Sequence, residues 1–257
     1  MIIAISNQKG GVGKSTTCIN LSAALALKKE KVLIVDLDPQ GNTSSGLGFD
    51  TKALELSSYE VLAGECMAKD AIKSSGRKNL DVLPANMNLA GTEIELANVE
   101  KREKVLIQAL KDVKDDYDEI FIDCPPSLGL LTINALTAAD GVLIPIQAEY
   151  YALEGLAQLL ETVSAVKANW NNSLEVFAAL ITMFDSRTQL AKDVSTEIRK
   201  YFADKVFKEE IPRNVRLSEA PSHQETIFEY ESWSKGAKAY NAVAKEFLEM
   251  KKKFLKK

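Results

Sequence analysis

Short apolar runs alternate with longer amphipathic segments along almost the whole chain. Residues 32–35, 120–122 and 142–144 are apolar without interruption. Strands that are apolar on both sides are typical of a parallel sheet covered by helices on both faces. The pattern predicts strands at 2–6, 31–36, 80–84, 119–124, 141–146, 176–182 and 205–211.

The segments between these runs repeat their apolar residues with a helical period. The clearest predicted helices are 16–27, 95–113, 153–168 and 240–257, and residues 41–79 are expected to form loops and short helices. Alternating strands and helices predict an α/β fold with a mostly parallel, twisted sheet and helices on both faces. We expect one domain over residues 1–257, with its sites at the carboxyl edge of the sheet.

The composition and net charge of the chain limit the kinds of partner that it can bind. The chain has 257 residues, 46% hydrophobic and 26% charged, which is ordinary for a globular protein, and its net charge is −4. No global field attracts such a chain to DNA, so any contact with nucleic acid needs a local basic patch. Cys18, Cys66 and Cys124 are scattered and are expected to be mostly buried thiols. With a core strand at the amino end and no apolar run of 18 residues, a cytoplasmic location is expected.

Residues 8–16 read Gln-Lys-Gly-Gly-Val-Gly-Lys-Ser-Thr and follow the first predicted strand directly. The phosphate-loop pattern G-x-x-x-x-G-K-S/T is met by Gly13, Lys14 and Ser15, whereas Gln8 replaces the first glycine and Lys9 adds a cation. Glycines let successive N–H groups point at phosphate oxygens, the lysine adds positive charge, and the serine hydroxyl can ligate Mg²⁺. The segment predicts binding of a nucleoside triphosphate.

Acidic residues end two of the predicted strands. Asp36 and Asp38 alternate at the end of strand 31–36 and so share one face, and Asp123 ends strand 119–124. Carboxylates at this edge can hold the water shell of Mg²⁺ and orient an attacking water. The sequence therefore predicts phosphoryl transfer to water.

Five motifs together resemble a known family. Residues 9–16 and 36–42 look like those of deviant Walker-A ATPases of the MinD/ParA superfamily, a group of P-loop NTPases. Residues 123–129, 149–155 and 211–222 narrow the resemblance to the ParA/Soj chromosome- and plasmid-partitioning ATPases. The likeness extends from residue 2 to about residue 245.

The resemblance implies roles for individual residues. Lys9 matches the signature lysine that reaches phosphate on the partner subunit of an ATP-sandwich dimer, and Lys14 matches the lysine that acts in its own subunit. Asp38 matches the aspartate that positions the hydrolytic water. The nucleotide would be held by Lys9, Gly10, Gly11, Val12, Gly13, Lys14, Ser15 and Thr16, with Pro212 and Asn214 at the adenine; Mg²⁺ would lie near Ser15, Asp36 and Asp123.

The resemblance also implies partners. ParA/Soj ATPases dimerise on ATP, bind double-stranded DNA without sequence preference, and hydrolyse ATP slowly until a ParB-type centromere-binding protein stimulates them. Arg187 matches a DNA-binding position, and Arg216, Lys235 and Lys238 are candidate companions. These properties predict a cytoplasmic, nucleoid-associated ATPase that drives chromosome or plasmid partitioning, without stable membrane insertion.

Two alternatives remain open at this point. A MinD-like ATPase would use the lysine-rich segment 240–257 as an amphipathic helix on a membrane surface, whereas the other arrangement docks its apolar stripe on the domain. A redox ATPase resembling the nitrogenase iron protein would need cysteines that bridge two subunits at a cluster.

Overall fold

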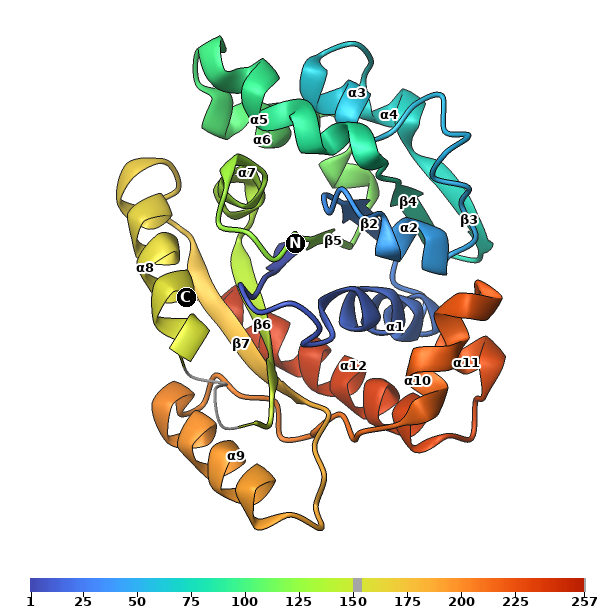
Figure 1. The fold of residues 1–257 in the computed structure, drawn as a ribbon, viewed down its shortest axis with the longest axis vertical. Helices are drawn as coiled ribbons and strands as arrows, with labels where there is room; N and C mark the ends of the chain where they lie inside the picture. Colours follow the sequence, from blue (N-terminus) through green and yellow to red (C-terminus); the bar gives the residue numbers. More distant parts are fainter. Residues whose placement is uncertain (150–153, 257) are drawn as a thin grey trace.

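One seven-stranded sheet organises the chain (Figure 1). The computed structural model describes residues 1–149 and 154–256. The strand order is β3-β4-β2-β5-β1-β6-β7, and every neighbouring pair is parallel except β3 with β4. The predicted mostly parallel sheet is thus confirmed. The strands are β1 Ile2–Ile5, β2 Val32–Asp36, β3 Lys73–Arg77, β4 Leu80–Leu83, β5 Glu119–Asp123, β6 Gly141–Gln147 and β7 Glu175–Thr182.

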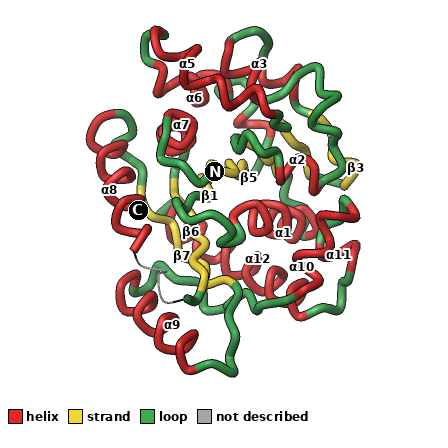
Figure 2. The backbone as a smooth tube through the Cα atoms, viewed as in Figure 1, coloured by secondary structure: helices red, strands yellow, loops and turns green. Residues whose placement is uncertain are grey.

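Helices cover both faces of this sheet (Figure 2). Helices α1 and α12 pack on one face, while α3, α6, α7 and α8 belong to the core on the other. The α-helices are α1 Lys14–Leu27, α2 Asn42–Gly46, α3 Ser58–Ala63, α4 Ala68–Ala71, α5 Thr92–Glu95, α6 Val105–Ala109, α7 Leu130–Ala138, α8 Glu154–Asn169, α9 Gln189–Phe202, α10 Val215–Glu219, α11 Ile227–Tyr230 and α12 Lys235–Phe254.

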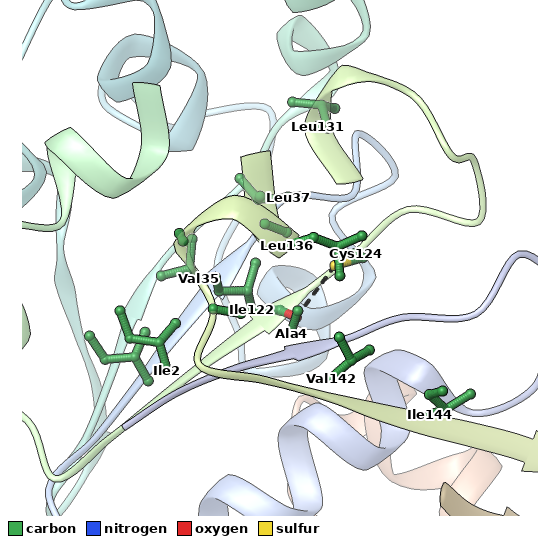
Figure 3. Close-up of a cluster of buried hydrophobic side chains, with 14 of the residues drawn as sticks. Ile2, Ala4, Val35, Leu37, Ile122, Cys124, Leu131, Leu136, Val142 and Ile144 are labelled. Carbon is green, nitrogen blue, oxygen red and sulfur yellow. Dashed lines mark hydrogen bonds between the residues drawn. The ribbon is translucent and has the colours of Figure 1, made fainter. Parts of the chain in front are cut away.

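The core beneath α7 is formed by alternate residues of the central strands, because every second side chain of a strand points to the same face of the sheet. Ala4, Ile122 and Val142 come from β1, β5 and β6 and face Leu136 of α7 (Figure 3). Cys124 completes this cluster, and its thiol donates to the Ile122 carbonyl at 3.8 Å. Burial of Cys18 and Cys124 confirms the prediction for two of the three thiols, whereas Cys66 is half-buried.

The predicted strand at 205–211 is wrong. Residues Val206 and Pro212 each form only an isolated bridge to the β7 region. The backbone N–H groups of Lys208 and Glu209 donate instead to the Glu246 carboxylate, at 2.7 and 3.0 Å. Because these donors are taken by a side chain of α12, the segment cannot extend a ladder along β7.

The predicted helix at 95–113 is also wrong as one element. It divides into short turns and α6, because Lys101 adopts a left-handed φ of 58° that interrupts helical hydrogen bonding. Within 41–79 the structure adds β3, which the sequence analysis did not predict. Its residues are polar and alternate between half-buried and exposed at the edge of the sheet, so no apolar run marks it.

Helix α12 docks its apolar stripe on the sheet. It begins at Lys235, five residues before the predicted start at 240, because the Ser234 hydroxyl caps it by accepting from Ala237 N at 3.0 Å. Tyr240 and Phe247 are buried, and the Phe247 ring lies 5.1 Å from that of Phe177. The docked arrangement is therefore confirmed, and the stripe is not left for a membrane surface. No helix in residues 1–149 and 154–256 is both long and apolar enough to cross a bilayer.

We expect Phe247→Ala to lower the free energy of unfolding by about 3–5 kcal/mol, because it leaves a cavity between α12 and the sheet. Leu255→Ala is the control, since Leu255 follows the same helix and is 61% exposed; it should cost less than about 0.5 kcal/mol. Urea unfolding followed by circular dichroism measures both. Equal effects of the two substitutions would contradict the docking of α12.

Candidate functional site

The register of three central strands brings the predicted site together. Ile5 of β1 and Asp36 of β2 both lie opposite Asp123 of β5, so the loop after β1 and the two aspartates meet at one sheet edge. A cleft of about 480 Å³ opens there. Its lining includes the predicted residues Gly10, Gly11, Gly13, Lys14, Ser15, Thr16 and Asp38.

The glycine loop has the backbone that the sequence requires. Gly11 and Gly13 have φ angles of 73° and 90°, in the left-handed region that glycine adopts without a steric cost. Gly13 is the N-cap of α1, so the first N–H groups of a 14-residue helix, and its positive end, face the cleft. Val12, unlike the other predicted loop residues from Gly10 to Thr16, does not line the cleft and is buried. Its carbonyl accepts a hydrogen bond from the Thr182 hydroxyl at 2.8 Å, which connects the loop to the end of β7.

Lys14 supplies a buried cation to this cleft. Its side chain is 7% exposed, and Nζ donates to the Lys9 carbonyl at 3.4 Å. Burial lowers the pKa of Lys14, while the nearby carboxylates of Asp123 and Asp38 act in the opposite direction. No carboxylate among the described residues lies within 4.0 Å of Nζ, so the charge is not neutralised by an ion pair.

Asp36 is held by hydrogen bonds on both oxygens. Oδ2 accepts from the Ser44 amide and hydroxyl at 2.9 and 2.6 Å, and Oδ1 accepts from Asp38 N at 3.1 Å. Burial, followed by the charge of Asp123, raises the pKa of Asp36 to about 8. Asp36 thus fixes α2 and the turn that carries Asp38, a role that the sequence analysis did not predict.

Asp123 has one unsatisfied oxygen. Its Oδ2 accepts from the Thr43 hydroxyl at 2.6 Å, whereas the buried Oδ1 has no hydrogen-bond partner within the described part of the chain. Burial raises the pKa of Asp123 to about 6. An orphaned carboxylate oxygen at the base of a phosphate loop fits a hydrated cation such as Mg²⁺, which takes one or two protein ligands and keeps several waters.

A second cavity of about 240 Å³ continues from the cleft. Gly13, Thr16 and Met183 line both, and the second also includes Pro212 and Asn214. The Asn214 Oδ1 accepts from Arg216 N at 2.9 Å and so caps α10, and this bond does not use the amide NH₂ donors. The sequence analysis missed Met183, because no motif marks this residue.

Lys9 lies outside the lining of the cleft. Its Nζ is 3.6 Å from Glu149 Oε2, and the other Glu149 oxygen is 3.2 Å from the Arg213 guanidinium. Gln147 also donates to that second oxygen, at 2.6 Å. The pair is partly exposed, which leaves Lys9 accessible to another molecule. Residues 150–153 of the predicted motif 149–155 lie outside the described residues.

The four predicted DNA-binding residues differ in their surroundings. Arg187 makes two hydrogen bonds to Asp185, at 2.9 and 2.7 Å, and holds the pKa of that carboxyl well below its usual range. Arg216 pairs with Glu219 at 2.8 Å. Lys235 and Lys238 are exposed and form no ion pair with any described residue. The sequence analysis did not predict these two arginine pairs.

The raised pKa of Asp36 predicts a pH effect on folding. Between its ordinary value near 3.8 and about 8, the folded state holds a proton that the unfolded state has lost, so stability falls as pH rises. We expect Asp36→Asn to make the free energy of unfolding less dependent on pH in this window, measured by urea titration at several pH values. Asp185→Asn is the control, because the lowered pKa of Asp185 acts only below that window. An unchanged slope in Asp36→Asn would contradict the assignment.

Comparisons with known proteins agree with this geometry. The family model described as an AAA domain matches residues 1–176. The sporulation initiation inhibitor protein Soj of Bacillus subtilis is 56% identical over 95% of this chain and 97% of its own length. The chromosome partitioning protein ParA of Myxococcus xanthus is 50% identical over 96% of this chain and 87% of its own length.

A solved structure shares the fold. Cobyrinic acid a,c-diamide synthase from Mycobacterium smegmatis, with bound ADP and magnesium, superposes with a TM-score of 0.86 at 39% identity. The match covers 98% of this chain and 95% of that one. The partitioning proteins Soj and ParA are similar to this chain over most of their length, and the phosphate loop and the aspartates meet at one edge of the sheet. The chain therefore belongs to the ParA/Soj family of partitioning ATPases.

Proposed function

We propose that this protein hydrolyses ATP with Mg²⁺ and uses the cycle to partition a chromosome or a plasmid. ATP would assemble a homodimer that binds double-stranded DNA without sequence preference, and a ParB-type protein would stimulate its slow hydrolysis. The observation that carries the proposal is the cleft itself, where the unpaired Lys14 ammonium, the glycine loop and the orphaned Asp123 oxygen converge.

The residues of the cleft suit nucleotide hydrolysis. The loop N–H groups and Lys14 would bind the phosphates, and the Ser15 hydroxyl with Asp123 would hold Mg²⁺, whose charge stabilises the phosphate oxygens. Asp38 lines the cleft, and its Oδ1 accepts from Gln40 N at 3.0 Å, so its position is fixed for orienting a water. Binding of ADP and magnesium by the Mycobacterium relative supports this assignment.

The adjoining cavity suits the base of the nucleotide. Pro212 and Asn214 line it, and the free amide NH₂ of Asn214 is a donor that an adenine ring nitrogen can accept from. Because Gly13 and Thr16 line both spaces, one ligand can extend from the phosphate loop to this cavity.

Lys9 suits a role across a dimer interface. A cation that reaches a phosphate of the partner subunit stabilises the transition state and makes dimerisation depend on ATP. Lys9 must leave Glu149 to do so. Exposed ion pairs of this kind contribute only about 0–1 kcal/mol, so the exchange costs little compared with a contact to phosphate.

DNA binding would come from the basic residues around α10 and the start of α12. Lys235 and Lys238 carry charges that no described carboxylate neutralises, and a dimer doubles their number. Each phosphate contact releases counterions, so even a net-acidic chain can bind DNA through such a patch at moderate salt. This binding would make the protein nucleoid-associated in the cytoplasm.

We expect Lys9→Ala to abolish ATP-dependent dimerisation and to lower ATP hydrolysis by about tenfold or more, because the contact to the partner's phosphate is lost. Light scattering after gel filtration, with and without ATP, and phosphate release measure the two effects. Lys111→Ala removes an exposed lysine that does not line the cleft and is the matched control. Dimerisation of Lys9→Ala at the wild-type ATP concentration would exclude the sandwich mechanism.

We expect the Lys235→Ala, Lys238→Ala double variant to weaken DNA binding and to reduce the salt slope by about 0.9 for each phosphate contact removed. Arg187→Ala should reduce the slope less, because Asp185 already neutralises part of the charge. Fluorescence anisotropy with ATP and duplex DNA of unrelated sequences, at several salt concentrations, gives both slopes. An unchanged slope in both variants would show that the DNA-binding surface lies elsewhere.

A further inference from the structure

The side chain of Trp233 is largely exposed to solvent, with 80% of its surface accessible. It lies in the turn between α11 and α12, directly before the Ser234 cap. Trp170, the only other tryptophan in the sequence, is half-buried against the core. Tryptophan is enriched at interfaces because it joins a large apolar area to a polar N–H, which makes this turn a candidate contact surface.

Two lysines that form no ion pair with a described residue follow this turn. Lys235 and Lys238 lie one turn apart at the start of a 20-residue helix, whose positive end adds to their field. Glu229, the acid in α11, is already paired with Arg77 at 2.8 Å. Glu231 contributes one negative charge in the same turn.

Helix α10 is fixed against this surface. A Cβ added to Gly236 would lie 2.7 Å from Leu217 Cγ, so the first turn of α12 and α10 are in direct contact. Arg216 follows Val215 at the start of α10, and Val215 is itself 69% exposed. Trp233 therefore directly precedes a helix whose first turn is packed against α10, and the candidate cations Lys235 and Lys238 follow it in that helix.

The surroundings favour DNA over a membrane. A helix that lies on lipid needs a continuous apolar face, but the apolar residues of α12 that follow the turn, Tyr240, Val243 and Phe247, are buried against the sheet. The start of α12 therefore offers no continuous apolar face, and the indole is followed in the chain by the lysines Lys235 and Lys238. Minor-groove binding proteins frequently combine basic residues with apolar side chains that insert between base steps.

We propose that the Trp233 indole enters a groove of duplex DNA beside the phosphates contacted by Lys235 and Lys238. This inference rests on the proposed DNA binding of the ATP dimer. The indole adds an apolar contact that does not depend on salt, and the lysines add the electrostatic part that does.

The two parts can be separated by measuring affinity as a function of salt. We expect Trp233→Ala to weaken binding of ATP-loaded protein to random-sequence duplex by about five- to tenfold at every salt concentration, with the salt slope unchanged. Trp233→Phe should recover part of the loss. Tyr201→Ala, which removes another exposed aromatic side chain at 63% exposure on α9, is the control and should bind as wild type.

Fluorescence reports on the contact directly. In a Trp170→Phe variant Trp233 is the only tryptophan, and we expect duplex DNA with ATP to change its emission and to protect it from acrylamide quenching. Vesicles of phosphatidylglycerol are the comparison, and a response to vesicles but not to DNA would overturn the proposal in favour of a lipid contact. Equal DNA affinity of Trp233→Ala and wild type would also overturn it. If the wild type itself bound no DNA with ATP, the proposed function would fail as well.

Discussion

The structure places two carboxyl groups and a lysine at the buried carboxyl edge of a parallel sheet, where burial opposes their ionisation. Asp36 and Asp123 are adjacent in register and removed from water; burial raises the pKa of both, and the charge of Asp123 adds to the cost of ionising Asp36. Hydrogen bonds from Ser44 and Thr43 offset part of that cost and, in doing so, fix α2 over the cleft. The remaining unsatisfied oxygen and the buried Lys14 are two opposite charges that a magnesium–nucleotide complex can satisfy together.

Helix α12 connects the surroundings of the cleft with the turn that carries Trp233. The Thr17 hydroxyl, in the first turn of α1, is 3.0 Å from the hydroxyl of the buried Tyr240. Tyr240 lines the cavity that we propose for adenine, and its helix begins directly after the turn that carries Trp233. Helix α12 thus connects the cavity proposed for the nucleotide base with the proposed DNA surface.

Ion pairs modify how the charged residues can act. Arg187 and Arg216 carry the charges expected of DNA contacts, but each is paired with a nearby acid, whereas the lysines at the start of α12 are not. Lys9 is likewise held by Glu149 in the single chain. A charged residue at a motif position therefore indicates which contact is possible. Its ion-pair partners determine how much of its charge is available to DNA or phosphate.

The sequence alone determined the alternation of strands and helices, the phosphate loop and the strand-end aspartates, because these depend on local periodicity and on residue chemistry at short spacing. It could not determine whether 205–211 joins the sheet, because Glu246 of a distant helix takes those N–H groups. Nor could the sequence reveal that both oxygens of Asp36 accept hydrogen bonds, or that Trp233 is exposed. Both properties depend on which segments pack around each residue. Only the tertiary structure decides where backbone donors and buried charges find their partners, since those partners are far apart in the chain.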